Sequence, residues 1–299
     1  MTERLVSIII PTYNSAPLLS RALKSVVNQT HQDWEALVID NHSADNTDEV
    51  VAGFADPRIR LLKANNKGVI AVSRNIGLGQ ATGKWAAFLD ADDWWLPEKL
   101  ALSLNSLQQG ADIVYHDLLR AGPRPHPFSR RVIRTRELTR PVYDDLVLHG
   151  NALLNSSVVV RRDLLAAVGG LSENPRLVAA EDFECWLRLA RRTEAFCRIP
   201  GRHGYYWIGN SNTSSPTRTL TCLGELRSHY LAPDPATGAA RSPGWLSFAL
   251  AKAHYDLGNR EESLAELAVC RAHEAPALVR MKAALLRTLI AMGAGSKRQ

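Results

Sequence analysis

Two hydrophobic patterns alternate along the first hundred residues. Short runs rich in β-branched residues predict strands, and apolar residues at the spacing of one helix face, such as Leu19, Leu23 and Val26, predict helices. We expect strands over 5–10, 36–39, 59–62 and 85–89, and helices over 18–27, after Thr47, over 69–78 and over 97–107. This alternation with short connections predicts an α/β fold, with a doubly wound, mainly parallel sheet and helices on both of its faces.

The pattern becomes less regular after residue 110. Strand-like runs remain at 112–115, 157–160 and 201–208, and helix-like runs at 162–168 and 182–191. A stretch rich in proline and glycine over 231–244 predicts a linker. Beyond it we expect a small C-terminal helical region: a helix–turn–helix over 245–271, broken at 257–259, and a last helix over 276–292.

Polar residues cluster at the carboxyl ends of three predicted strands, at 11–14, 40–43 and 90–93. Ligands of open α/β sheets bind beyond those ends, so we expect one common site there. Asp90 and Asp92 stand two apart in the third cluster, and hard divalent cations such as Mg²⁺ and Mn²⁺ prefer carboxylate oxygens. Taken alone, an acidic triplet is weak evidence, because acidic loops between strand and helix are often only helix caps.

The composition is ordinary for a folded domain, with 299 residues, 45% of them hydrophobic and 22% charged. No run of about 18 apolar residues occurs, and the N-terminus lacks the pattern of a signal peptide. The four cysteines are widely spaced, which favours reduced thiols over a disulfide framework or a zinc site. We therefore expect a cytoplasmic protein.

The net charge of +6 is concentrated in one arginine-rich segment, 118–142, which carries seven arginines against one acid, Glu137. A solvated loop is one interpretation of this segment. The other is a patch for ligand phosphates or for an anionic membrane surface. Nucleic acid is not an expected partner, because the segment has a single aromatic residue, Phe128, and no recognisable binding module.

Four motifs occur in order along the first half of the chain: VSIIIPTYN at 6–14, VIDNHS at 38–43, SRNIGL at 73–78 and FLDADD at 88–93. Their order, spacing and intervening elements resemble the family 2 glycosyltransferases over roughly residues 5–110. The resemblance continues more thinly to EDFECWLRL at 181–189, which is similar to that family's "ED" helix. It implies a GT-A-type fold and inverting transfer of a sugar from a nucleotide sugar.

The resemblance also implies a division of the chain and a set of donor-binding residues. We expect a glycosyltransferase domain over 1–230, with a nucleotide-sugar-binding half (1–110) and an acceptor-side half (111–230), then the linker and a helical extension over 245–299. Within the first half an aromatic side chain lies against the base, usually uracil, a carboxylate accepts from it, and an arginine holds the nucleotide end. The implied nucleotide-sugar-binding residues are Pro11, Thr12, Tyr13, Asn14, Asp40, Arg74, Asp90 and Ala91.

The same resemblance implies the chemistry. Asp92 matches the direct ligand of the divalent metal, Mn²⁺ or Mg²⁺. Asp182 matches the catalytic base that takes the acceptor proton, and its neighbour Glu181 lies near the acceptor. Asn151, before a predicted strand, is a further acceptor-side candidate, although a buried hydrogen-bonded turn explains this region equally well.

Each of these residues also has a purely structural interpretation. Tyr13 can be a packing aromatic, Asp40 can cap the following turn, and Arg74 can form a structural salt bridge. Glu181 and Asp182 at a helix start can be favourable charges on the helix dipole. We prefer the functional interpretation because the motifs occur together.

The chain departs from the family pattern in two places. The second motif is commonly Asp-Asp-Gly-Ser and here is Asp40-Asn41-His42-Ser43, which leaves the base preference open. An aromatic-Arg-x-His segment common after the ED helix is replaced by 205–211 (YYWIGNS), without the arginine or histidine. The metal is therefore expected to have fewer protein ligands, and 209–215 is expected to close differently over the donor.

The expected activity is that of a metal-dependent inverting hexosyl- or N-acetylhexosaminyl-transferase, with UDP as the favoured nucleotide. We expect a bacterial enzyme that builds cell-surface polysaccharide, glycolipid or another glycoconjugate on a saccharide, a lipid-linked sugar or a protein. A nucleotidyltransferase would want a glycine-rich basic loop after the first strand, which 11–14 is not. A degenerate, non-catalytic binding protein is disfavoured because Asp40, Asp92 and Asp182 are all retained.

The C-terminal region resembles a single tetratricopeptide-type helix pair over 251–264, with Gly258 at the turn. One such unit cannot bury its own apolar face and must dock on something. The catalytic domain is the favoured surface, and a homodimer through these helices is an alternative. Peripheral contact of the basic last helix with the inner face of the cell membrane is another.

Overall fold

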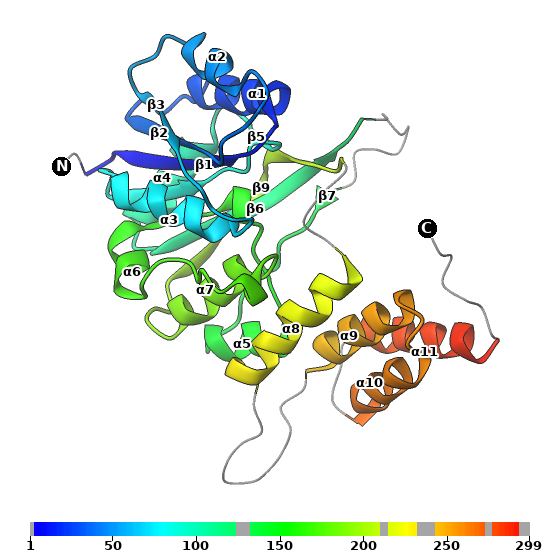
Figure 1. Ribbon diagram of the computed structural model, residues 1–299. Helices are drawn as coiled ribbons and strands as arrows, with labels where there is room; N and C mark the ends of the chain where they lie inside the picture. The colour runs from blue at the N-terminus through cyan, green and yellow to red at the C-terminus, as the bar shows by residue number, and fades with distance from the viewer. Residues whose placement is uncertain (1–2, 124–131, 210–214, 232–242, 273–276, 293–299) are drawn as a thin grey trace. The chain divides into compact units, whose positions relative to one another are not determined.

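A computed structural model describes residues 3–123, 132–209, 215–231, 243–272 and 277–292. Within them nine strands form one sheet in the order β3-β2-β1-β4-β8-β6-β9-β5, with β7 paired to β6 (Figure 1). The strands are β1 (Val6–Thr12), β2 (Trp34–Asp40), β3 (Ile59–Lys63), β4 (Trp85–Phe88), β5 (Trp94–Trp95), β6 (Ile113–Ala121), β7 (Val132–Ile133), β8 (Val159–Arg161) and β9 (Phe196–Trp207).

Strand direction divides the sheet. The strands β3, β2, β1 and β4 are all parallel, as the alternating pattern predicts. Beyond β4 the pairing is mixed: β8 runs antiparallel to β4 and β6, whereas β9 runs parallel to β6 and antiparallel to β5. The α/β fold is confirmed, and its uniformly parallel part is the half that carries the four motifs.

Five helices lie beside these strands: α1 (Ala16–Val27), α2 (Thr47–Ala52), α3 (Ile70–Gln80), α4 (Lys99–Gln108) and α6 (Arg162–Ala167). Ile8 and Ile10 pack with α1 and α4 in one core cluster. On the other face, a Cβ added to Gly77 of α3 would stand 2.7 Å from side-chain atoms of Ile9 and Ile39. Helices therefore cover both faces of the sheet, as predicted, and the close approach of α3 requires a glycine.

The sequence pattern misses several elements, most of them in the second half. The strand expected over 201–208 is β9, which begins at Phe196 and is 12 residues long. β5, β7 and the 3-10 turn Asn155–Ser157 were not expected, nor were α5 (Val142–His149) and α8 (Pro216–Tyr230). β5 and β7 have two residues each, too few for a period-two pattern to show.

The chain forms two compact units. The first contains 1–139, 152–173 and 188–211, and the second contains 140–151, 174–187 and 212–299. The second unit holds α5, most of α7 (Glu181–Ala190), α8, α9 (Gly244–Asp256), α10 (Arg260–Ala272) and α11 (Ala277–Ala291). The expected linker over 231–244 lies mostly outside the described residues, and the domain division remains a prediction.

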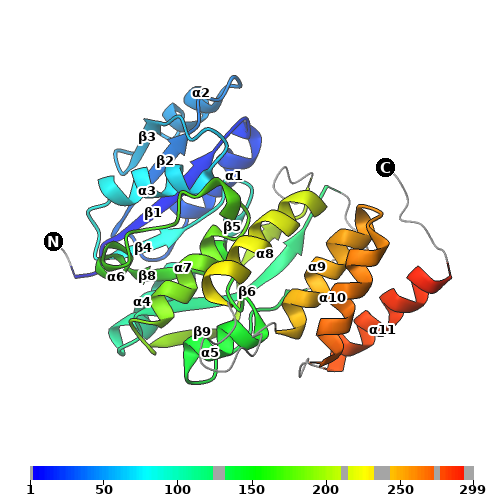
Figure 2. The ribbon, with the colours of Figure 1, turned by 60° about the horizontal axis from the view of Figure 1, so that its bottom comes forward.

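Inside the second unit, α9, α10 and α11 pack side by side around a small core that contains Leu267, Leu286 and Ile290 (Figure 2). Trp245 of α9 donates its indole N–H to the Val147 carbonyl of α5 at 3.0 Å. Arg227 of α8 forms a two-armed ion pair with Glu266 of α10, with N–O distances of 2.8 and 2.7 Å. The helix pair thus docks on α5 and α8.

Among the described residues there is no helix with the length and apolarity needed to cross a bilayer.

Candidate functional site

Strand register brings the three polar clusters to one edge of the parallel strands. Thr12, the last residue of β1, pairs with Asp40, the last residue of β2. The Leu89 amide, just past β4, donates to the Ile9 carbonyl of β1 at 3.1 Å, and Asp90 to Asp93 then close a turn through a 3.0 Å backbone hydrogen bond. The expected common edge is therefore present.

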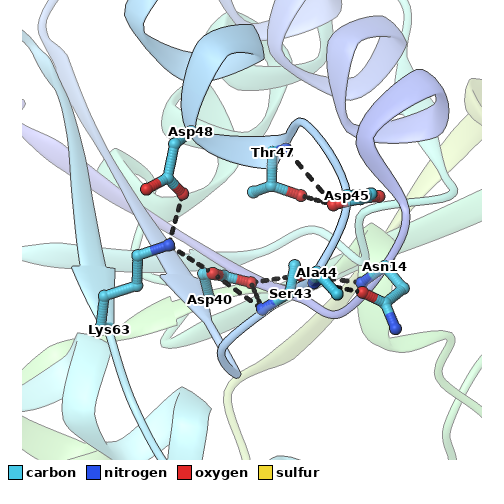
Figure 3. A network of polar contacts seen from close by, with 8 residues as sticks. All are labelled: Asn14, Asp40, Ser43, Ala44, Asp45, Thr47, Asp48 and Lys63. Carbon is cyan, nitrogen blue, oxygen red and sulfur yellow. Dashed lines mark hydrogen bonds and ion pairs between the residues drawn. The ribbon is translucent and has the colours of Figure 1, made fainter.

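Two loops of this edge are tied to each other, as Figure 3 shows. The Asn14 amide donates to Ser43 Oγ at 2.8 Å, and the Ala44 amide donates to Asn14 Oδ1 at 2.8 Å. Asn14 adopts a φ of 46°, a left-handed conformation that asparagine tolerates well. Tyr13 beside it is 55% exposed, so its ring is open to a ligand.

Asp40 is buried and fully engaged. Its carboxylate accepts from the Ser43 amide at 3.2 and 3.1 Å and from Lys63 Nζ at 2.8 Å (Figure 3). Lys63 also donates to Asp48. The capping interpretation of Asp40 therefore describes what the carboxylate does in this structure, and its contact with a nucleoside remains a prediction.

His42 explains one departure from the family pattern. It has a φ of 55°, in the left-handed region, and it occupies the place where the common motif has glycine. A residue with a Cβ costs roughly 1–2 kcal/mol in that conformation, whereas glycine adopts it freely. The loop thus keeps the backbone of the common motif with a residue that is less suited to it.

Arg74 links α3 to the acidic turn. Its guanidinium is buried and donates to Asp90 Oδ1 at 2.7 Å. The same oxygen accepts from the side-chain Nδ2 of Asn155 at 3.2 Å, and the Asp90 backbone N–H donates to Ser156 Oγ at 3.1 Å. Arg74 therefore forms the salt bridge expected from its structural interpretation, and this bridge also fixes Asp90 at the ligand edge.

Negative charge accumulates in the turn from Asp90 to Asp93. Burial and then repulsion from Asp90 raise the pKa of the Asp92 carboxyl to about 6, against an opposing effect of Arg21. Burial and repulsion from Asp90 and Asp92 also raise the pKa of Asp93. Raised carboxyl pKa values at a sheet edge mark a place where an added cation would be favourable.

The donor atoms of this turn fit a hard divalent cation. They are carboxylate oxygens, and Asp93 Oδ2 is buried without a hydrogen-bond partner. Within the described ranges no group of three or more His, Cys, Asp or Glu side chains has the arrangement of a metal site. Protein oxygens would therefore supply only part of a coordination shell.

The expected catalytic base lies in the second unit, at the start of α7. Asp182 is half-buried, and its Oδ1 accepts from the Phe183 amide at 2.6 Å. Glu181 is buried and accepts from the Ala179 amide at 2.7 Å, across a turn in which Ala179 has a φ of 78°. The Asp182 bond engages one amide of the first turn of α7, where acidic side chains also suit the helix dipole, and the proton-accepting role of Asp182 stays a prediction.

The acceptor-side candidate Asn151 and the turn that follows it, which contains Ser156, have different settings. Asn151 is exposed and belongs to the second unit. Ser156 is buried, and its carbonyl accepts from the Trp95 indole at 2.7 Å, which matches a buried polar turn. Of the segment 209–215, residues 210–214 lie outside the described part of the chain, as do Arg124, Arg130 and Arg131 of the arginine-rich segment.

Sequence reasoning missed three residues of this edge: Arg21, Lys63 and Asp93. Lys63 ends β3 opposite Asp40, so the parallel register of two predicted strands could have revealed it. Asp93 is the last residue of the FLDADD motif, but the resemblance implies no role for it. Arg21 gave no signal, because a lone arginine in an amphipathic helix normally faces solvent.

Comparison with known proteins identifies the family and the fold. Residues 7–159 match the family model described as Glycosyl transferase family 2. The chain is 42% identical over 107 residues to UDP-Glc:alpha-D-GlcNAc-diphosphoundecaprenol beta-1,3-glucosyltransferase WfgD of Escherichia coli, a match that covers 36% of this chain and 42% of that protein. It is 39% identical over 114 residues to the succinoglycan biosynthesis protein ExoO of Rhizobium meliloti, covering 38% of this chain and 33% of that protein. The matches span less than half of either relative.

Solved structures resemble the chain over a greater length. TarS 1–349 of S. aureus in complex with UDP-GlcNAc superposes with a TM-score of 0.61 at 18% identity, covering 89% of this chain and 80% of that one. The mannosyltransferase PcManGT of Pyrobaculum calidifontis in complex with GDP-Man and Mn²⁺ superposes with a TM-score of 0.56 at 22% identity, covering 97% and 80%. This likeness confirms the expected GT-A-type fold.

Proposed function

The chain belongs to glycosyltransferase family 2, and we propose that it transfers a hexose or N-acetylhexosamine from a nucleotide sugar to an acceptor hydroxyl with inversion. One observation carries the proposal: the acidic turn 90–93, with Arg74 held against Asp90, lies at the same sheet edge as the exposed ring of Tyr13. A base-stacking ring, a metal-binding acid and a cation that holds the acidic turn in place are parts that donor binding needs.

The proposed reaction exchanges one bond at the anomeric carbon. Asp182 accepts the proton of the acceptor hydroxyl, the hydroxyl oxygen forms a bond to the anomeric carbon, and the bond from that carbon to the diphosphate oxygen breaks. The nucleoside diphosphate leaves with the bonding electron pair. Attack on the face opposite the leaving group inverts the configuration. Glu181 and Asn151 are proposed to line the acceptor side.

Mn²⁺ or Mg²⁺ would be held by Asp92, with Asp90 and Asp93 adding to the negative field of the turn. When bound, such an ion neutralises charge on the departing diphosphate. Arg74 is proposed to orient Asp90 toward the nucleotide end of the donor. UDP is the proposed nucleotide, consistent with the UDP-Glc in the name of the Escherichia coli relative.

The acceptor is proposed to be a lipid-linked sugar at the cytoplasmic face of a bacterial membrane, in the synthesis of a cell-surface polysaccharide. The name of the Escherichia coli relative gives a diphosphoundecaprenol-linked acceptor, and that of the Rhizobium meliloti relative gives succinoglycan biosynthesis.

The exposed face of α11 is proposed to contact an anionic membrane surface. Leu278, Met281, Leu285 and Met292 are 57%, 63%, 62% and 67% exposed. The helix carries Arg280, Lys282 and Arg287 and has no acidic residue. Apolar side chains beside basic ones are typical of helices that lie in the membrane interface, and a like-charged copy of α11 is a poorer fit.

The transfer is tested through Asp182→Asn, which retains size and most hydrogen bonding but cannot accept a proton. We expect donor binding by calorimetry close to that of the parent and turnover lower by roughly two to four orders of magnitude, the usual contribution of a general base. Glu181→Gln is the matched control and should cost less. Turnover of Asp182→Asn within a few-fold of the parent would remove Asp182 from the mechanism.

Membrane contact is tested with vesicles of phosphatidylglycerol and of phosphatidylcholine. The parent should sediment with the anionic vesicles at low salt, and Leu285→Glu should not. Leu264→Glu, an exposed leucine on α10, is the control and should bind as the parent does. A dimer by light scattering that Leu285→Glu dissociates, without vesicle binding by the parent, would replace the membrane with a second copy of the chain.

A further inference from the structure

Arg21 of α1 contacts the main chain of the acidic turn. Its Nη2 donates to the backbone carbonyl of Asp92 at 2.9 Å. Its guanidinium lies over the Trp94 ring, 3.6 Å from the ring centroid, and 4.5 Å from that of Trp207. One planar cation therefore contacts the main chain of the expected metal ligand and two aromatic rings from different strands.

The aromatic rings belong to a layer that ties the turn to β9. Trp94 stacks on Tyr205 with centroids 4.6 Å apart and an interplanar angle of 12°. The two residues are also paired between β5 and β9. The Trp207 amide donates to Asp93 Oδ1 at 2.8 Å. Asp92 is thus fixed at its carbonyl by Arg21, while the next two residues are fixed by β9.

We propose that Arg21 is a positioning residue that orients Asp92 for the divalent metal and links the metal turn to the end of β9. This inference rests on the proposed metal site at Asp92. Arg21 acts through the Asp92 backbone and the aromatic layer, with no contact to the donor required. Arg21 donates its hydrogen bond to the backbone carbonyl of Asp92, so the Asp92 carboxylate stays available to the ion.

Arginine suits this position for a geometric reason. A planar guanidinium stacks on indole rings while its N–H groups donate in the same plane, whereas a lysine ammonium provides a point charge without a stacking face. Arg21→Lys therefore retains the charge and loses the stack, and Arg21→Met loses both while retaining much of the apolar length.

The chain offers a matched control at the opposite edge of the sheet. Arg58, before β3, lies 3.7 Å from the centroid of the Trp34 ring and donates to the Gln32 carbonyl at 3.0 Å. It shares with Arg21 the contacts to an indole ring and to a backbone carbonyl, but at the amino ends of β2 and β3, and it also forms a two-armed ion pair with Asp56 at 3.0 and 2.7 Å. Arg58→Met should thus reproduce any general loss of stability without touching the metal turn.

The experiment titrates Mn²⁺ alone into the intact parent, Arg21→Met, Arg21→Lys and Arg58→Met, and follows the free ion by electron paramagnetic resonance. Thermal midpoints and the Mn²⁺ dependence of turnover are measured alongside. We expect Arg21→Met to raise the Mn²⁺ dissociation constant roughly 10- to 100-fold, the usual effect of losing a residue that supports a metal ligand. The Mn²⁺ dissociation constant of Arg21→Lys should lie between those of Arg21→Met and the parent. Excess Mn²⁺ should restore most of the turnover of Arg21→Met. Arg58→Met should bind Mn²⁺ as the parent does.

Two results would overturn the inference, and they differ. Equal Mn²⁺ constants for the parent, Arg21→Met and Arg58→Met would show that Arg21 has a structural role only, while the proposed metal site stands. A parent that binds no Mn²⁺ and turns over fully in EDTA would remove the metal from the proposed function, and the role of Arg21 with it.

Discussion

Two acidic stretches at the same sheet edge balance their charge in opposite ways. After β2, Asp40 is matched by Lys63 and the Ser43 amide, and Asp45 accepts from Thr47 and from the Ala16 amide at the start of α1. After β4, the carboxylates of the turn 90–93 crowd together. There the pKa values of Asp92 and Asp93 rise, and one oxygen of Asp93 has no hydrogen-bond partner.

The difference separates a structural use of acid from a functional one. Although burial raises the pKa of Asp45, the hydrogen bonds from Thr47 and Ala16 lower it below the usual value, so its ionised form stabilises the loop. In the turn 90–93, Arg74 pairs with Asp90, but burial and repulsion make ionisation of Asp92 and Asp93 less favourable than in water, and a further cation would offset this. Asp40 and Asp45 are therefore matched by groups within the protein, whereas we propose that the turn after β4 is complemented by a metal and a donor.

The largest expected effect is a loss of turnover in a variant of Asp92, in contrast to a loss of stability in a variant of Asp40. Asp92→Ala should lower Mn²⁺-dependent turnover by about 100-fold or more, because a metal at the leaving group stabilises the transition state by several kcal/mol. Its fold should be retained. Asp40→Ala should instead lower the free energy of unfolding by about 2 kcal/mol, mainly through the lost turn hydrogen bonds, since the exposed end of Lys63 adds little.

Urea unfolding in EDTA and turnover in Mn²⁺, measured on both variants, check this pair of effects. Full activity of Asp92→Ala in EDTA, or an unchanged unfolding midpoint for Asp40→Ala, would erase the contrast between the two stretches.

The second effect is a pH dependence specific to Asp92. Its pKa is raised from 3.8 to about 6 in the folded protein, so the folded state binds a proton more tightly than the unfolded state between these values. This contribution to stability is therefore lost as pH rises through 6. Without metal, the parent should be less stable than Asp92→Asn at pH 7.5, by on the order of 1–3 kcal/mol; the difference should fall to roughly a third of that at pH 4.5 and vanish only below the unfolded pKa of 3.8.

Metal binding should show the opposite trend. Because the proton and the ion compete for Asp92, Mn²⁺ affinity should fall by up to about tenfold per pH unit below 6. Urea titrations at the two pH values and Mn²⁺ titrations from pH 5 to 7.5 measure both trends. A stability difference between parent and Asp92→Asn that is the same at both pH values would contradict the raised pKa.

The smallest expected effect is on stability and concerns His42, in the loop after β2. His42→Gly should relieve the left-handed strain but increase the entropy of the unfolded chain, so the expected net gain is about 0.5 kcal/mol. Chemical unfolding of parent and variant, with Gly77→Ala as an expected destabilising counterpart, measures it. A loss of stability in His42→Gly would show that the imidazole itself contributes to the loop.

Sequence patterns predict the parallel half well because its information is local. The run from Val6 to Ile10 and the alternation of Ile8 and Ile9 between two cores follow from period-two burial. The positions of Asp40 and Asp90 follow from where strands end. The contact of Arg21 with Asp92 does not, since the two residues are 71 positions apart and nothing local joins them.

The helices of the second unit show what sequence periodicity cannot predict. In α11 apolar residues occupy two faces, and the sequence gathers Leu278, Met281 and Leu285 on one side without saying whether that side is covered. The structure buries the other face, with Leu286 and Ile290 in the core. Periodicity predicts the helix, but which face docks depends on α9 and α10.

The most direct test of the central claim is an anomalous difference map from crystals grown with UDP and Mn²⁺. The account predicts that the manganese peak lies against the Asp92 carboxylate and the UDP diphosphate, with the uracil against Tyr13. A diphosphate bound away from the turn 90–93, or manganese bound elsewhere with UDP in place, would contradict it.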